Sequence, residues 1–153
     1  MITTADGLVL DGVWAPPVGD AVGCVALCHP HPLDGGTMNA PLMRLVTATL
    51  TDAGLWVLRF NFRGVGASQG TWGGGSGEVL DVAAAVEFAA AALPALPHGV
   101  AGWSFGATTS LRWQAETGSS LPWAGIAPGI TPYRGAAPPA VGDLVAAPRL
   151  IVL

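Results

Sequence analysis

Lysine is absent from this chain, and charged residues of any kind are scarce. Only 10% of the 153 residues are charged, against roughly 25% in ordinary soluble domains, and the formal charge at pH 7 is −4. This composition excludes the basic surface that nucleic-acid binding needs. Because 51% of the residues are hydrophobic, much of the chain must be buried. We expect one globular domain over residues 1–153, a length that buries roughly two thirds of the unfolded surface.

The chain also lacks a long uninterrupted hydrophobic run. The longest apolar region, residues 79–96, is broken by Asp81, Glu87 and Pro94 before it reaches the roughly 20 residues that a membrane span needs. The N-terminus, "MITTADGLVLDG", has neither a basic start nor a continuous apolar segment, so it does not resemble a signal peptide. These absences predict a cytoplasmic protein without a membrane partner.

Cysteine is limited to two residues, Cys24 and Cys28, in one apolar run. A strand would place them on the same face about 13 Å apart, too far for a disulfide. Together with His29 and His31 they form "CVALCHPH", which has the residue types of a zinc site. A strand would hold Cys24 away from the other three, and no second ligand pair follows. We therefore expect two buried free thiols and no metal.

Short apolar runs and amphipathic stretches alternate along the chain. This order predicts an α/β fold with a mainly parallel sheet and helices on both faces. Residues 128–148, rich in proline and glycine, form the least regular segment, and a loop of that length is typically functional or poorly ordered. The predicted strands are 7–14, 21–29, 55–62, 98–103, 121–128 and 148–153, and the predicted helices are 38–53, 77–93 and 105–117.

The sequence Gly102-Trp103-Ser104-Phe105-Gly106 lies between a predicted strand and a predicted helix. In the G-x-S-x-G pattern the serine stands at a sharp turn, and the two glycines let neighbouring backbone come close. The turn also places the serine at a helix N-terminus, which favours developing negative charge. We interpret Ser104 as a catalytic nucleophile. The alternative is a serine that only caps the helix.

The segment 29–39, "HPHPLDGGTMN", follows the strand at 21–29. Acyl transfer needs backbone N–H donors for the developing oxyanion: one from the residue after the nucleophile, Phe105, and one from a loop such as this. Prolines have no N–H, which leaves His31 or Leu33, and we favour His31 as the first donor after the turn. The alternative is a rigid polyproline-like loop with two surface histidines.

The segment 61–70, "NFRGVGASQG", also follows a predicted strand and is rich in glycine. Gly64, Gly66 and Gly70 resemble a dinucleotide fingerprint, but their spacing is G-x-G-x-x-x-G and the next helix starts only near Gly77. No acidic residue ends a strand about twenty residues later. We therefore expect no dinucleotide site.

Taken together, "HPHPLDGG", "NFRGVGASQG" and "GWSFGA" resemble the α/β-hydrolase superfamily. The resemblance is strongest to its small, lidless, dienelactone-hydrolase-like bacterial serine hydrolases, and it covers nearly the whole chain. It implies that Ser104 is the nucleophile, that the backbone N–H groups of His31 and Phe105 form the oxyanion hole, and that Gly102 and Gly106 shape the elbow. It also implies an ester or related acyl substrate and no metal or organic cofactor.

The triad that this resemblance implies is incomplete. No histidine follows Ser104, and the only later acids are Glu116 and Asp143. All three histidines precede the nucleophile, and His29 or His31 could act as the base only if one reaches its hydroxyl. We therefore expect a C-terminally truncated chain, two thirds to three quarters of a complete domain, that is almost inactive. The alternative is a non-catalytic acyl-binding or interaction protein with the same fold.

The predicted strand at 148–153 would lie at the edge of the sheet. Apolar edges pair readily with other chains, so we expect this edge to support self-association.

Overall fold

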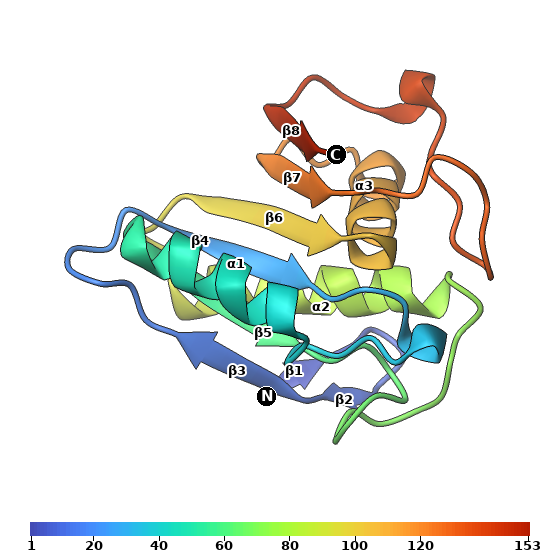
Figure 1. The fold of residues 1–153 in the computed structure, drawn as a ribbon, viewed down its shortest axis with the longest axis horizontal. Helices are drawn as coiled ribbons and strands as arrows, with labels where there is room; N and C mark the ends of the chain where they lie inside the picture. The colour runs from blue at the N-terminus through green and yellow to red at the C-terminus, as the bar shows by residue number, and fades with distance from the viewer.

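The computed structural model describes all 153 residues and contains one six-stranded sheet (Figure 1). The strands lie in the order β3-β5-β4-β6-β7-β8, and every neighbouring pair is parallel except β3 with β5. The mainly parallel α/β fold predicted from the alternating pattern is therefore confirmed. The strands are β3 (Gly12–Ala15), β4 (Gly23–Cys28), β5 (Leu55–Phe60), β6 (His98–Trp103), β7 (Trp123–Ile126) and β8 (Arg149–Val152).

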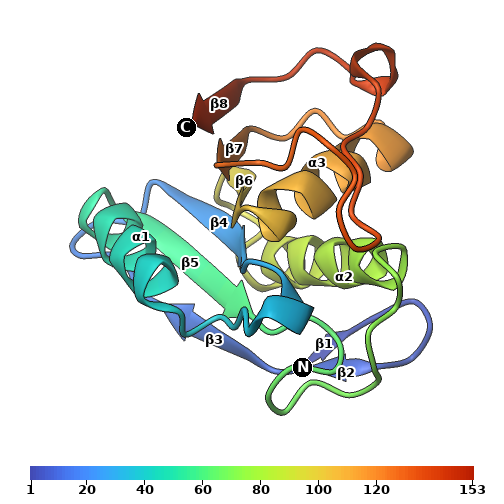
Figure 2. The same ribbon diagram turned by 45° about the vertical axis from the view of Figure 1, so that its right-hand side comes forward.

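Helices cover both faces of the sheet. Helix α1 (Pro41–Asp52) lies on one face, and α2 (Gly77–Ala92) and α3 (Phe105–Thr117) lie on the other (Figure 2). A main core of 19 buried residues joins α2 and α3 to the sheet, and a smaller cluster of four, which includes Met43 of α1, lies on the opposite face. Strand β4 is buried along its length because it has helices on both sides, which explains its continuous apolar run.

The predicted strand at 7–14 is divided in two. Residues Val9–Leu10 form β2, which pairs with β1 (Ile2–Thr3) in a separate small sheet, and β3 begins at Gly12. Between them, Asp11 turns its backbone to the 61–70 segment: its N–H donates to Ser68 Oγ, and its carbonyl accepts from the N–H of Asn61. These hydrogen bonds to residues 61–70 separate β2 from β3 at Asp11.

The parallel pairing of β4 and β6 determines where the predicted site residues lie. Their register pairs Cys28 with Gly102, so the two strands end side by side. The loop after β4 and the turn after β6 therefore emerge at the same edge of the sheet. This edge brings together segments 29–39 and 102–106, which are about seventy residues apart in the sequence.

Strand β8 forms one edge of the sheet and is largely uncovered (Figure 1). Leu150 and Ile151 are 60% and 57% exposed, and Val152 is also exposed. Self-association through this edge stays a prediction. The longest helix, α2, has 16 residues, and none of the helices combines the length and apolarity that crossing a bilayer requires.

Candidate active site

Ser104 lies at the turn between β6 and α3 in a strained backbone conformation. Its φ of 52° and ψ of −115° place a residue with a side chain in a region that costs on the order of 1–3 kcal/mol. Hydrogen bonds on both sides hold it there: its N–H donates to the carbonyl of Ile126 at 2.8 Å, and its carbonyl accepts from the N–H of Thr108 at 3.0 Å. The side chain makes no capping hydrogen bond to the helix, so the purely capping interpretation of Ser104 is wrong.

The two glycines of the elbow permit close backbone packing. A Cβ on Gly102 would collide with the backbone of Gly106 and Ala107, and a Cβ on Gly106 would collide with the carbonyls of Cys28 and His29. The start of α3 therefore lies directly against the end of β4. Only glycine at both positions allows the helix N-terminus to approach the loop after β4 so closely.

Of the two candidate oxyanion donors in the loop after β4, one is free. His31 caps a short 3-10 helix, η1 (Pro32–Asp34), and its Nδ1 accepts a hydrogen bond from the N–H of Leu33 at 3.1 Å. The N–H of Leu33, the alternative oxyanion donor, is therefore already used. The N–H of His31 makes no hydrogen bond within the protein. Phe105 is the first residue of α3, a position whose N–H has no carbonyl partner in its own helix.

The imidazole of His31 is buried among aromatic rings. Its centroid lies 4.7 Å from that of Phe105, 4.9 Å from that of Trp72 and 5.7 Å from that of Tyr133. Its Nε2 lies 3.4 Å from the carbonyl of Arg134, which can only accept, so Nε2 carries the proton. With Nδ1 already accepting, neither ring nitrogen is free to take a proton from Ser104.

His29 is fully buried, and His31 is only 5% exposed. The interpretation of "HPHP" as a loop with two surface histidines is therefore wrong for both of them. The Nε2 of His29 accepts from the N–H of Phe62 at 3.0 Å, and its Nδ1 donates to the carbonyl of Pro30 at 2.6 Å. Burial lowers the pKa of His29 to about 4, so the ring is neutral near pH 7. Both of its nitrogens join β4 to neighbouring backbone, which is a structural role.

The remaining candidate groups lie far from the nucleophile. His98 starts β6 at the opposite end of the strand from the elbow, about 17 Å away at the usual rise per residue, and bonds the carbonyl of Leu93. Glu116 lies about three turns along α3 and pairs with Arg112 at 2.6 Å. Asp143 lies in the exposed 3-10 turn η2 (Val141–Asp143). None of these three groups can therefore serve Ser104 as a base or a triad acid.

The low pKa of His29 predicts a pH dependence of stability. The folded pKa of about 4 lies below the ordinary 6.5, so the unfolded chain binds this proton first as the pH falls. Stability from this group is complete above about pH 6.5 and is lost as the pH falls toward 4, by on the order of 3 kcal/mol. Urea unfolding at several pH values should show this slope, and His29→Gln, which keeps an acceptor for Phe62, should remove it. An identical slope in the variant would contradict the assignment.

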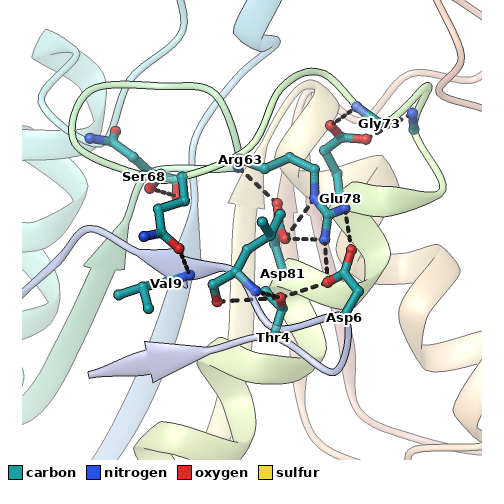
Figure 3. Close-up of polar contacts among 12 residues, drawn as sticks. Thr4, Asp6, Val9, Arg63, Ser68, Gly73, Glu78 and Asp81 are labelled. Carbon is teal, nitrogen blue, oxygen red and sulfur yellow. Dashed lines mark hydrogen bonds and ion pairs between the residues drawn. The ribbon is translucent and has the colours of Figure 1, made fainter.

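An ion-pair network, buried at Arg63 and Asp81 and exposed at Asp6, supports the turn after β5 (Figure 3). Arg63 donates to Asp81 of α2 through Nε and Nη2, and its Nη1 pairs with Asp6 at 2.8 Å. The hydrogen bond from Arg63 is the main reason why the pKa of Asp6 is lowered to about 2. The backbone N–H of Arg63 also donates to Asp81. This network anchors the 61–70 segment to α2 and to the N-terminal hairpin.

Glu78 fixes the next part of the same segment. Its carboxylate accepts from the N–H groups of Gly73 and Gly75, both at 2.8 Å, at the start of α2 (Figure 3). These bonds tie the loop before α2 to the first turn of that helix. The same loop carries Trp72, whose ring packs against His31 and Phe105.

Two cavities meet at Ser104. One is about 350 Å³ and the other about 70 Å³, and both are lined by His31, Asp34 and Ser104. Asp34 also pairs with Arg134 at 2.8 Å. The larger cavity is completed by Pro30, Gly35, Gly36, Ala40, Trp103 and Ala127, and the smaller by Phe105, Thr108, Gly129, Thr131, Tyr133 and Ala136.

Sequence reasoning missed four side chains of this site: Asp34, Trp72, Tyr133 and Arg134. Asp34 lies inside the "HPHPLDGG" segment, and its position in that motif could have indicated it. Tyr133 and Arg134 belong to the irregular segment 128–148. The length of this segment indicated a function, but no pattern in the sequence predicted where its residues lie in the fold.

Solved structures of known proteins share this arrangement. An α/β serine hydrolase homologue from Coxiella burnetii superposes with a TM-score of 0.83 at 34% identity, covering 99% of this chain and 74% of that one. A serine hydrolase without a lid from Xanthomonas campestris gives 0.75 at 29% identity, covering 99% and 71%. An esterase from Pyrococcus furiosus gives 0.71 at 31% identity, covering 84% and 50%.

Sequence comparisons agree with the structural ones. An uncharacterized protein from Rickettsia prowazekii is 38% identical over 104 residues, which are 67% of this chain but only 44% of that protein. A family model described as "Serine aminopeptidase, S33" matches residues 20–145, well over half of the chain. The chain belongs to that family, and with it to the α/β-hydrolase superfamily.

Proposed function

We propose that this chain carries the nucleophile and oxyanion hole of a serine hydrolase that cleaves esters or related acyl compounds. The observation that carries the proposal is the conformation of Ser104, a strained serine between two cavities with the free N–H groups of His31 and Phe105 beside it. The family assignment supports a hydrolase, and the esterase among the structural relatives supports an ester substrate.

The proposed reaction proceeds through an acyl-enzyme. Ser104 Oγ forms a bond to the carbonyl carbon and gives its proton to a base, while the N–H groups of His31 and Phe105 stabilise the oxyanion. The carbon–oxygen bond to the alcohol breaks, and the alcohol leaves with that proton. Water then attacks the acyl-serine in the same way and releases the acid. Since no ring nitrogen of the three histidines is available at Ser104, we propose that the base comes from outside residues 1–153.

A second candidate is a non-catalytic acyl-binding protein. The engagement of both His31 nitrogens within the protein favours it, because no base stands ready at the serine. Such a protein would bind acyl compounds in the same two cavities without turning them over.

Substitution of the nucleophile tests the first candidate. Fluorophosphonate probes form a stable bond to an activated serine, so a version of the chain extended by any downstream coding sequence should be modified once, at Ser104, and Ser104→Ala should abolish the modification. Intact-mass analysis followed by peptide mapping provides the measurement. Ser110, a buried serine of α3, is the matched control, and Ser110→Ala should leave the modification in place. Modification that survives Ser104→Ala would refute the assignment, and the absence of any modification at Ser104 in the extended protein would favour the acyl-binding protein.

A further inference from the structure

The two cavities at Ser104 differ fivefold in volume, and this difference bears on the substrate. Any ester bound at Ser104 has two arms, the acyl chain and the alcohol, which extend in different directions from the reacting carbon. The small cavity of about 70 Å³ and the large cavity of about 350 Å³ share His31, Asp34 and Ser104, so the nucleophile stands between them. Each arm therefore has a space of its own.

The floor of the small cavity is rigid. Phe105 and Thr108 are buried residues of α3. Thr108 Oγ1 accepts a hydrogen bond from the N–H of Gly129 at 2.8 Å and lies 3.2 Å from the carbonyl of Ser104. This hydroxyl fixes the chain after β7 to the helix that carries the nucleophile. The cavity cannot deepen on this side without breaking these bonds.

The roof of the small cavity is the 133–136 turn, in which Tyr133 and Ala136 exchange two backbone hydrogen bonds of 2.8 and 2.9 Å. Three contacts hold the turn over Ser104. Tyr133 packs edge-on against His31, and Arg134 pairs with Asp34. Gly135 packs backbone to backbone against the turn that Glu78 fixes, where a Cβ on either Gly75 or Gly135 would collide with the opposite chain.

The order of the two reaction steps indicates which cavity holds the acyl arm of the ester and which holds the alcohol. The alcohol must leave and water must replace it, whereas the acyl group stays attached to Ser104 through both steps. The leaving arm therefore belongs in the large cavity, which offers more room for the alcohol to leave and for water to replace it. The acyl arm belongs in the small cavity, under the 133–136 turn.

The volume then limits the acyl chain. The small cavity has about one fifth of the volume of the large one, so it favours a shorter arm than the large cavity admits. We propose that the small cavity is the acyl pocket and that the substrates are esters whose acyl chain is short relative to the alcohol. This inference rests on the proposed function for the location of the reacting carbon.

The test uses a nucleophile that needs no base. Ser104→Cys places a thiol at a helix N-terminus, where its thiolate attacks the carbonyl carbon of a p-nitrophenyl ester directly, and p-nitrophenolate leaves with the electron pair of the broken bond. Burial raises the pKa of Cys24 to about 11 and raises that of Cys28 further, so neither native thiol competes. Intact mass verifies one acylation per chain. Because this reaction does not depend on Ser104, its outcome is separate from that of the fluorophosphonate experiment.

Acylation rates are compared for the acetate, butanoate and octanoate esters, each divided by the rate with free N-acetylcysteine. We expect acetate to exceed octanoate by about 10-fold or more, the usual cost of added methylenes that a pocket cannot hold. In the same background Tyr133→Ala, which opens the roof, should reduce that ratio at least threefold. Tyr133→Phe keeps the ring, and Ala40→Leu narrows only the large cavity, so both should preserve the ratio.

Three results would overturn the inference: equal corrected rates for acetate and octanoate, an unchanged ratio in Tyr133→Ala, or no acylation by any ester. A ratio that falls in Ala40→Leu instead would place the acyl arm in the large cavity and refute the assignment of the arms.

Discussion

The purified 153-residue chain should hydrolyse p-nitrophenyl acetate barely faster than buffer between pH 6 and 9. Without a base, the Ser104 hydroxyl must lose its proton to water during attack, because an ordinary alcohol is hardly ionised at neutral pH. In a related triad, loss of the histidine costs on the order of 10⁶ in kcat, and the oxyanion hole and binding retain roughly 10³–10⁴ over water. The measurement is p-nitrophenolate release, with Ser104→Ala as the reference for background.

A version of the chain extended by any downstream coding sequence provides the comparison. If the extended protein is active and the short one is not, the base comes from outside residues 1–153, as proposed. Turnover by the short chain within about tenfold of that of the extended protein, and lost in Ser104→Ala, would contradict the prediction. The ring of His31 would then have to be released from Leu33 and Arg134 to serve as the base.

In the extended protein, removal of the His31 N–H should slow the phosphonylation of Ser104 by about 10²-fold or more, the usual effect of losing one oxyanion donor. His31→Pro removes the N–H and the ring, whereas His31→Ala removes the ring alone, so the ratio of their rates isolates the N–H. Proline fits the backbone, since φ at His31 is −56° and its N–H has no partner within the protein. The measurement is the rate of modification by a fluorophosphonate, followed by intact mass.

The two His31 variants share the loss of contacts with Trp72, Phe105 and Tyr133, so their thermal unfolding temperatures should be similar. Equal and large losses of rate in both would mean that the ring itself takes part in the reaction. Equal and small losses would mean that another N–H serves as the donor, and the assignment of His31 would be wrong.

Periodicity predicted the layers of the fold well because each element has a distinct physical signature. The helix at 105–117 has the predicted bounds, since it begins after a glycine-flanked serine and ends at Gly118, which takes a left-handed conformation. The division of 7–14 was not predicted, because it depends on hydrogen bonds between Asp11 and residues that lie some fifty positions later. Such long-range contacts leave no local pattern.

The candidate site was likewise predicted only in part from the sequence. The motif predicted Ser104, and the missing N–H of proline limited the loop donors to His31 and Leu33. The choice between these two depended on a rotamer: only the structure places the His31 ring against the N–H of Leu33. The 133–136 turn was beyond prediction because its place depends on an ion pair and a glycine contact between distant segments.

The strain at Ser104 also bears on the choice between the two candidate functions. A side chain at φ 52° has a stability cost on the order of 1–3 kcal/mol, a sizeable part of the 5–15 kcal/mol by which domains are usually stable. If the hydroxyl had no task, glycine at this position would relieve the cost through a single substitution. Simple acyl binding needs no serine in this conformation. A reacting serine, as proposed, is the role that would offset the cost of this conformation.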